Sequence, residues 1–142
     1  MTTFWDNPRK LLIDGLFDAM PETAKKLFEE GVLHFSSGYH REAVLPILSC
    51  LNLVISQFAR SVSDTNDCFN SDEAMSILQQ PSVGISSDLC NRLEFIRLTY
   101  SQPGVGPERG FTEHEVEYLI VACIDVCERM LSDDHYRPTM LN

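Results

Sequence analysis

Apolar residues recur every three or four positions along most of this chain, the spacing that predicts amphipathic helices. The first such segment follows Asn7 and Pro8, a capping residue and a first-turn proline, and is expected to form a helix over about 8–20. A second helix is expected over about 22–37. It should end at Gly38, because glycine readily adopts the left-handed conformation that terminates helices.

The most apolar segment lies between Tyr39 and Ser63 and is predicted to be the central core helix. Pro46 stands inside it and lacks the backbone N–H that a helix interior needs. We therefore expect either a later helix start or a kink at this position. The serine-, asparagine- and aspartate-rich stretch that follows predicts a surface loop.

Three further helices are predicted in the second half of the chain. Ser71 is expected to cap a short one that extends to about residue 79. A longer helix is expected over 87–100. Thr112, with Glu115 three residues later, has the signature of a capping box and is expected to begin a last helix that reaches residue 131.

Short connections between these segments favour antiparallel packing of neighbours. The sequence therefore predicts an all-α fold, an antiparallel bundle of four long helices with one or two additional shorter helices. A chain of 142 residues is the size of one domain, so we interpret 1–142 as a single helical domain with a frayed tail over 133–142. Its composition, 44% hydrophobic and 23% charged, is that of a folded protein.

The cellular setting is inferred from what the sequence contains and lacks. The N-terminal residues show no basic region followed by an apolar core, and polar residues such as Ser49 and Asn52 interrupt the most apolar run, so neither a signal peptide nor a membrane span is expected. Five cysteines at irregular spacing fit a reducing compartment. A cytoplasmic protein is the prediction.

Four cysteines, Cys50, Cys90, Cys123 and Cys127, fall on the apolar sides of predicted helices, where free cysteine acts as a small hydrophobe. Cys123 and Cys127 are four residues apart, a spacing that two metal ligands can use. No second pair of ligands stands nearby in sequence, so no metal site is expected. No phosphate-binding or dinucleotide motif occurs, and no cofactor is expected.

The formal net charge of −10 is concentrated in the second half of the chain. Residues 1–60 contain six Lys or Arg and seven Asp or Glu, whereas residues 61–142 contain five and fourteen. This charge repels a phosphate backbone, which disfavours RNA as a partner. The simplest explanation of this acidic charge is that it solvates the exposed helix faces. The alternative is an acidic inhibitor or immunity protein that covers a basic surface on its target.

Two family resemblances follow from these segments. In KKLFEEGVLHFSSGYHREAVLPILSC, which follows Ala24 directly, Gly31 and Ala43 stand twelve residues apart. The positions of these three residues are similar to those of a tetratricopeptide repeat. Such repeats need about three copies to close a core, and the chain contains no second copy. We therefore interpret this stretch as one helical hairpin whose small residues allow close packing.

The second resemblance extends from about residue 24 to 131. GYHREAVLPILSCL, the later IRLTYSQPGVGPERG and a long closing helix resemble the HEPN superfamily, including abortive-infection C-terminal domains. The resemblance implies an all-helical, usually dimeric protein of prokaryotic defence or toxin–antitoxin systems. Catalytic members of the family carry an Arg, then four to six intervening residues, then a His, and Arg109 and His114, with four residues between them, fit this pattern.

Two interpretations of Arg109 and His114 stay open. In a metal-independent endoribonuclease, the histidine would move the proton of a ribose 2′-hydroxyl while the arginine held the phosphate. In the other interpretation the arginine pairs with a carboxylate and the histidine is a polar first-turn residue. Four glutamates crowd the site and repel phosphate: Glu108, Glu113, Glu115 and Glu117. We therefore expect a non-catalytic protein-interaction domain, either a homodimer or the partner of another protein.

Overall fold

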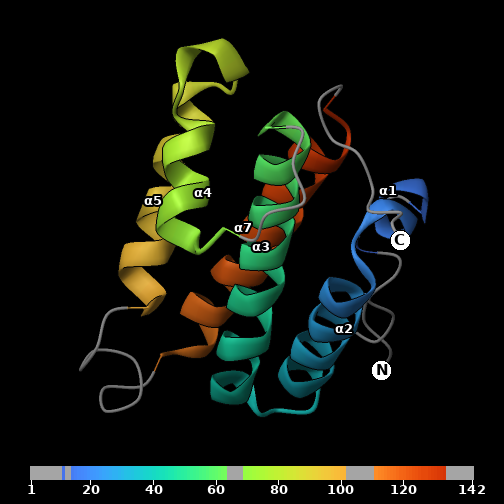
Figure 1. Ribbon diagram of the computed structural model, residues 1–142. Helices are drawn as coiled ribbons and strands as arrows, with labels where there is room; N and C mark the ends of the chain where they lie inside the picture. Colours follow the sequence, from blue (N-terminus) through green and yellow to red (C-terminus); the bar gives the residue numbers. More distant parts are fainter. Residues whose placement is uncertain (1–10, 12–13, 64–68, 102–110, 134–142) are drawn as a thin grey trace.

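The computed structural model describes residues 11, 14–63, 69–101 and 111–133 (Figure 1). These residues form helices and contain no β-strand, so the predicted all-α fold is confirmed. In chain order the helices are α1 (Asp14–Ala19), α2 (Glu22–Ser36), α3 (His40–Ser63), α4 (Ser71–Leu78), the short 3-10 helix η3 (Pro81–Val83), α5 (Ser87–Ser101) and α7 (Glu113–Leu131). The second half of the helix expected over 8–20 contains α1, most of its first half lies outside the described residues, and so does nearly all of the predicted tail.

The bundle is built around α3, with α2 on one side, α4 and α5 on the other, and α7 packed behind it (Figure 1). Consecutive long helices run antiparallel, α2 against α3 and α5 against α7, as their connections predict. In contrast, α3 and α7 are distant in sequence and run in the same direction. The central pair of the bundle is therefore parallel.

A Schellman motif ends α2 and turns the chain into α3. The Gly38 amide donates to the Phe35 carbonyl oxygen at 3.1 Å, and the Tyr39 amide donates to the His34 carbonyl oxygen at 2.8 Å. Gly38 has a φ of +92°, a conformation that glycine adopts without the steric cost of a Cβ. The predicted helix end at this glycine is confirmed.

Small residues allow α2 and α3 to approach closely. A Cβ built on Gly31 would lie 2.6 Å from two side-chain carbons of Ile47 and 3.3 Å from the Ala43 carbonyl oxygen. All three residues are buried, and Ile47 has no exposed surface. The close hairpin packing predicted from the sequence is present.

Pro46 lies inside α3, which runs without interruption from His40, so the expected later start is wrong. Proline cannot donate the hydrogen bond that the carbonyl of Glu42 would otherwise accept. Packing offsets this loss, because α3 has more buried residues than any other helix of the described residues. Its buried residues are Ala43, Val44, Pro46, Ile47, Leu48, Cys50, Leu51, Val54, Ile55, Phe58 and Ala59.

Capping boxes begin α4 and α7. Asn70 caps α4: its side chain accepts from the Glu73 amide at 2.8 Å, and its own amide donates to the Glu73 carboxylate at 3.0 Å. The prediction that Ser71 caps this helix is therefore wrong by one residue, since only Asn70 has a glutamate three residues later. The box of Thr112 and Glu115 at α7 is confirmed, at 3.1 and 2.9 Å.

The length and hydropathy of α3 would also allow a membrane crossing. Its 18-residue window has a mean hydropathy of 1.5, and 61% of that window is buried by the rest of the protein. Large side chains from several helices fill the space around it, among them Phe28 of α2, Leu93 of α5 and Leu119 of α7. No polar or charged residue of the described part is fully buried. The position of α3 is that of a core helix.

Gly31→Ala should lower the free energy of unfolding by about 1–2 kcal/mol. Overpacking against Ile47 costs about 1–3 kcal/mol, and the better helix propensity of alanine offsets up to about 1 kcal/mol of it. Chemical denaturation measures the change. Gly15→Ala is the matched control, because a Cβ at that position would have no atom within 4 Å. Equal stability of the two variants would contradict a close approach at Gly31.

Candidate functional site

The two ends of the segment that joins α5 to α7 are held together by aromatic side chains. The rings of Tyr100 and Phe111 lie 5.0 Å apart between centroids, and both residues are buried. The Tyr100 hydroxyl donates a hydrogen bond to the Glu115 carbonyl oxygen at 2.6 Å. This clamp, Tyr100 with Phe111 and Glu115, joins the C-terminal end of α5 to the first turn of α7.

Of the sequence-predicted pair of Arg109 and His114, the histidine lies next to this clamp, one residue before Glu115 in the first turn of α7. Arg109 is outside the described residues, so the structure places only the histidine. The His114 side chain is 97% exposed on the first turn of α7, and its Nδ1 lies 4.0 Å from a carboxylate oxygen of Glu117. It faces solvent, and the depression described below does not include it.

An apolar surface that the sequence analysis did not single out lies along α5 and α7. Phe95 and Leu98 of α5 and Tyr118 and Val121 of α7 are each between 46% and 52% exposed. The rings of Phe95 and Tyr118 meet edge to face, with centroids 6.3 Å apart. Leu98 and Val121 each follow one of these rings by about one helical turn. We call these four residues the α5–α7 face.

Arginine ion pairs join α5 to α7 and to α4. Arg92 of α5 pairs with Asp125 of α7, and Arg129 pairs with the same carboxylate group at 3.6 Å. Arg97 pairs with Asp72 of α4 and with Glu94 at 3.3 Å. These pairs tie the outer helices together, and they balance acidic side chains that would otherwise surround the apolar residues with negative charge.

A wide, shallow depression adjoins the two aromatic rings. It is lined by Asp88, Asn91, Arg92, Phe95 and Tyr118. Its walls combine aromatic surface with polar side chains that can donate or accept hydrogen bonds. A side chain of another protein can therefore enter next to Phe95 with both apolar and polar contacts.

The sequence did contain a signal for this surface: α5 and α7 have more apolar residues than their buried stripes need. One stripe of α5 is buried in the core, through Leu89, Cys90, Leu93 and Ile96, while Phe95 and Leu98 fall outside that stripe. The same holds for Tyr118 and Val121 on α7. A helix that is apolar on a second side has a second surface to cover.

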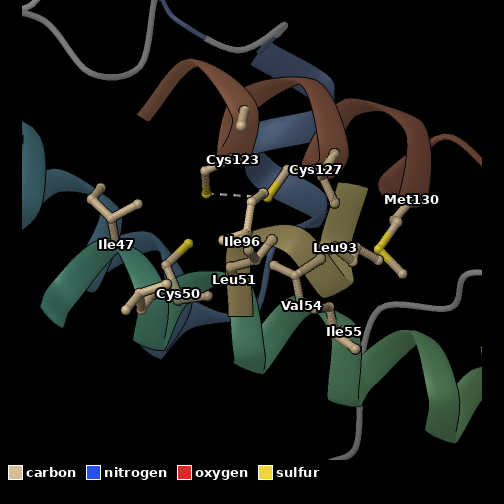
Figure 2. Packing of buried hydrophobic residues seen from close by; sticks show 14 of the residues in the cluster. Ile47, Cys50, Leu51, Val54, Ile55, Leu93, Ile96, Cys123, Cys127 and Met130 are labelled. Atoms are coloured by element: carbon tan, nitrogen blue, oxygen red, sulfur yellow. Dashed lines mark hydrogen bonds between the residues drawn. The ribbon is translucent and has the colours of Figure 1, made fainter. Parts of the chain in front are cut away.

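The structure also brings Cys50 of α3 to Cys123 and Cys127 of α7. All three thiols are buried, and their sulfur atoms lie within 4.8 Å of one another. Cys123 and Cys127 share a contact of 3.9 Å between Sγ atoms (Figure 2). The predicted burial of these cysteines is confirmed. Their meeting could not be predicted, because Cys50 joins the other two only through the packing of α3 on α7.

Hydrogen bonds among the three thiols separate their acidities. Hydrogen bonding with Cys127, followed by hydrogen bonding with Cys50, lowers the pKa of the Cys123 thiol. The same interactions raise the pKa of Cys127, and the contact with Cys123 followed by burial raises that of Cys50.

Comparisons with known proteins were made at three levels. No family model matches the chain, and no curated protein or solved structure matches it either.

The clamp gives the protein a testable dependence on alkaline pH. Burial, followed by the charges of Glu115 and Tyr118, raises the pKa of Tyr100 from 10 to about 12. The unfolded chain thus loses this proton at lower pH than the folded protein. The resulting stabilisation is complete below pH 10 and disappears as the pH rises through about 12.

Tyr100→Phe should reduce the loss of stability between pH 10 and pH 12 by about 2 kcal/mol. At neutral pH the variant should be less stable by about 1 kcal/mol, because the hydrogen bond to Glu115 is lost. Urea denaturation at a series of pH values measures both effects. Tyr39→Phe, at a side chain in the α2–α3 turn that is 61% exposed, is the control and should follow the wild type. Parallel pH profiles for Tyr100→Phe and the wild type would exclude the clamp as the cause.

Proposed function

We propose that this chain is a non-catalytic protein-interaction domain that forms a homodimer through the α5–α7 face. The observation that carries this proposal is the cluster of four half-exposed apolar side chains on two neighbouring helices. Scattered exposed apolar residues are ordinary on protein surfaces, whereas a contiguous apolar group with a polar border is typical of a protein interface. Aromatic residues and arginine are also the residue types enriched in interface cores.

The charge distribution around the α5–α7 face is compatible with a second copy of the chain as the occupant. Two chains of net charge −10 repel each other through most of their surfaces. Beside the α5–α7 face, Arg92 lines the depression with Phe95 and Tyr118 and is paired with Asp125, which also pairs with Arg129. A two-fold axis through the face would bring the same apolar residues of both copies together, with these ion pairs at the rim.

The resemblance of residues 24–131 to the HEPN superfamily supports the same proposal, because it implies a dimer. It also suggests a cytoplasmic role in prokaryotic defence or a toxin–antitoxin system, as a HEPN-like domain without ribonuclease activity. The high exposure of His114 supports the non-catalytic interpretation: a catalytic histidine works on a substrate that is held in place, and water surrounds this side chain.

Leu98→Ser should raise the dissociation constant of the dimer about 100-fold. In a two-fold interface each substitution removes an apolar contact twice, at about 1.4 kcal/mol per side. Leu33→Ser on α2 is the matched control, because both leucines are 52% exposed and α2 lies on the opposite side of the bundle (Figure 1). Analytical ultracentrifugation over a range of concentrations measures the constants. A monomeric wild type, or equal effects of the two substitutions, would refute the proposed interface.

Added salt should strengthen the dimer or leave it unchanged. Salt screens the repulsion between two acidic chains and does not weaken apolar contacts. An acidic inhibitor bound to a basic target would respond in the opposite way. The same ultracentrifugation experiment at low and high ionic strength distinguishes the two, and a dimer that dissociates with added salt would argue against the α5–α7 face.

Wild-type protein, Arg109→Ala and His114→Ala should all leave RNA intact under identical conditions. The physical reason is the exposure of His114 and the acidic side chains around it. Incubation with a mixture of single-stranded and structured RNA, followed by gel analysis, measures cleavage. Cleavage by the wild type that is lost in both variants would show that the domain is an active ribonuclease.

A further inference from the structure

The three cysteines of the α3–α7 contact have the spacing of a metal site. A metal ion bonded to three sulfur atoms at about 2.3 Å in a trigonal plane separates those atoms by about 4.0 Å. The Cys123 and Cys127 sulfurs lie 3.9 Å apart, and all three are within 4.8 Å of one another. Figure 2 shows the thiols of Cys50 and of the α7 pair directed into the same space between the helices.

A fourth sulfur lies beside this cluster. The Sδ atom of Met20, at the end of α1, is 4.0 Å from the Cys50 Sγ, and its side chain is almost completely buried. A thioether is a weak ligand for most metal ions but a suitable one for soft cations. The four sulfurs come from three separate helical segments, so the fold assembles this set.

We propose that Cys50, Cys123 and Cys127 bind one Cu(I) ion, with Met20 as an additional thioether ligand. The candidate ligand atoms are all sulfur, and these soft donors favour a soft metal ion. Structural zinc sites are nearly always four-coordinate with thiolate, imidazole or carboxylate ligands, and here a thioether would be the fourth ligand. Cu(I) is stable with three sulfur ligands and does not need a better fourth one.

Each of the three cysteines binds the ion as a thiolate, so each releases its proton to water when the metal binds. The oxidation state of copper does not change on binding.

Cys90 provides a comparison within the same protein. Its thiol is also buried, but it packs on α5 against the Leu78 carbonyl oxygen at 3.8 Å, and it does not belong to the sulfur cluster. Cys90 is therefore a free cysteine that fills space in the core. The two environments allow metal binding to be tested against ordinary core packing in one chain.

The test uses the full chain, reduced and handled without oxygen. Cys68, the fifth cysteine of the sequence, lies outside the described residues and is replaced by alanine in every sample, so that Cys68→Ala is the background. Cu(I) is supplied with a chromophoric chelator that competes for it. The expected result is one Cu(I) per chain, an X-ray absorption spectrum with sulfur neighbours only, and a rise of roughly 5–10 °C in the melting temperature at a hundredfold excess over the dissociation constant.

Variants assign the ligands. Cys50→Ala, Cys123→Ala and Cys127→Ala should each abolish stoichiometric binding, Met20→Leu should weaken it about tenfold, and Cys90→Ala should bind as the background protein does. Cys50→Val keeps the core filled if the alanine variant fails to fold. Binding that survives loss of Cys50, a nitrogen or oxygen ligand in the spectrum, or tighter binding of Zn(II) than of Cu(I) would overturn the proposal. The proposal would also be overturned if the reduced protein took up no Cu(I) and formed a disulfide in air.

Discussion

The burial of α3 is the constraint on which the rest of this structure depends. An apolar helix of 24 residues cannot be covered by one neighbour, so it needs helices on several sides. The turn at Gly38 supplies α2 directly, and the absence of a side chain at Gly31 lets the two helices meet closely. The opposite cover comes from α7, at the other end of the chain. Closing the core therefore requires the whole chain between them to be in place.

The position of α5 follows from this arrangement. Because α7 already packs on α3, α5 lies further out and contacts α7 along one edge (Figure 1). Its core residues point inward, and the two rings of Phe95 and Tyr118 remain at the surface. The same packing that brings Cys50 to the α7 cysteines thus also produces the apolar surface. Both candidate sites are consequences of how α7 is placed.

Local features were predictable from the sequence, whereas contacts between residues distant in the sequence were not. The 3.6-residue periodicity, Gly38 and the Thr112 box locate α2, α3 and α7 within one or two residues, because each signal acts within a turn of the chain. The later helix start expected at Pro46 is wrong because tertiary packing outweighs a single missing hydrogen bond. The sulfur cluster depends on the parallel alignment of α3 with α7, which no local pattern encodes. The α5–α7 face was visible in the sequence, because α5 and α7 have more apolar residues than one buried stripe needs.

The Tyr100 clamp has a consequence for how the chain can vary. It holds Ser101 and Phe111 near each other by contacts that do not involve the residues between them. The entropy needed to close that connection grows only with the logarithm of its length, by about 0.6 kcal/mol per doubling. Extra residues between α5 and α7 would thus cost the bundle little, which makes this connection the place where the chain can acquire new sequence while its core stays the same.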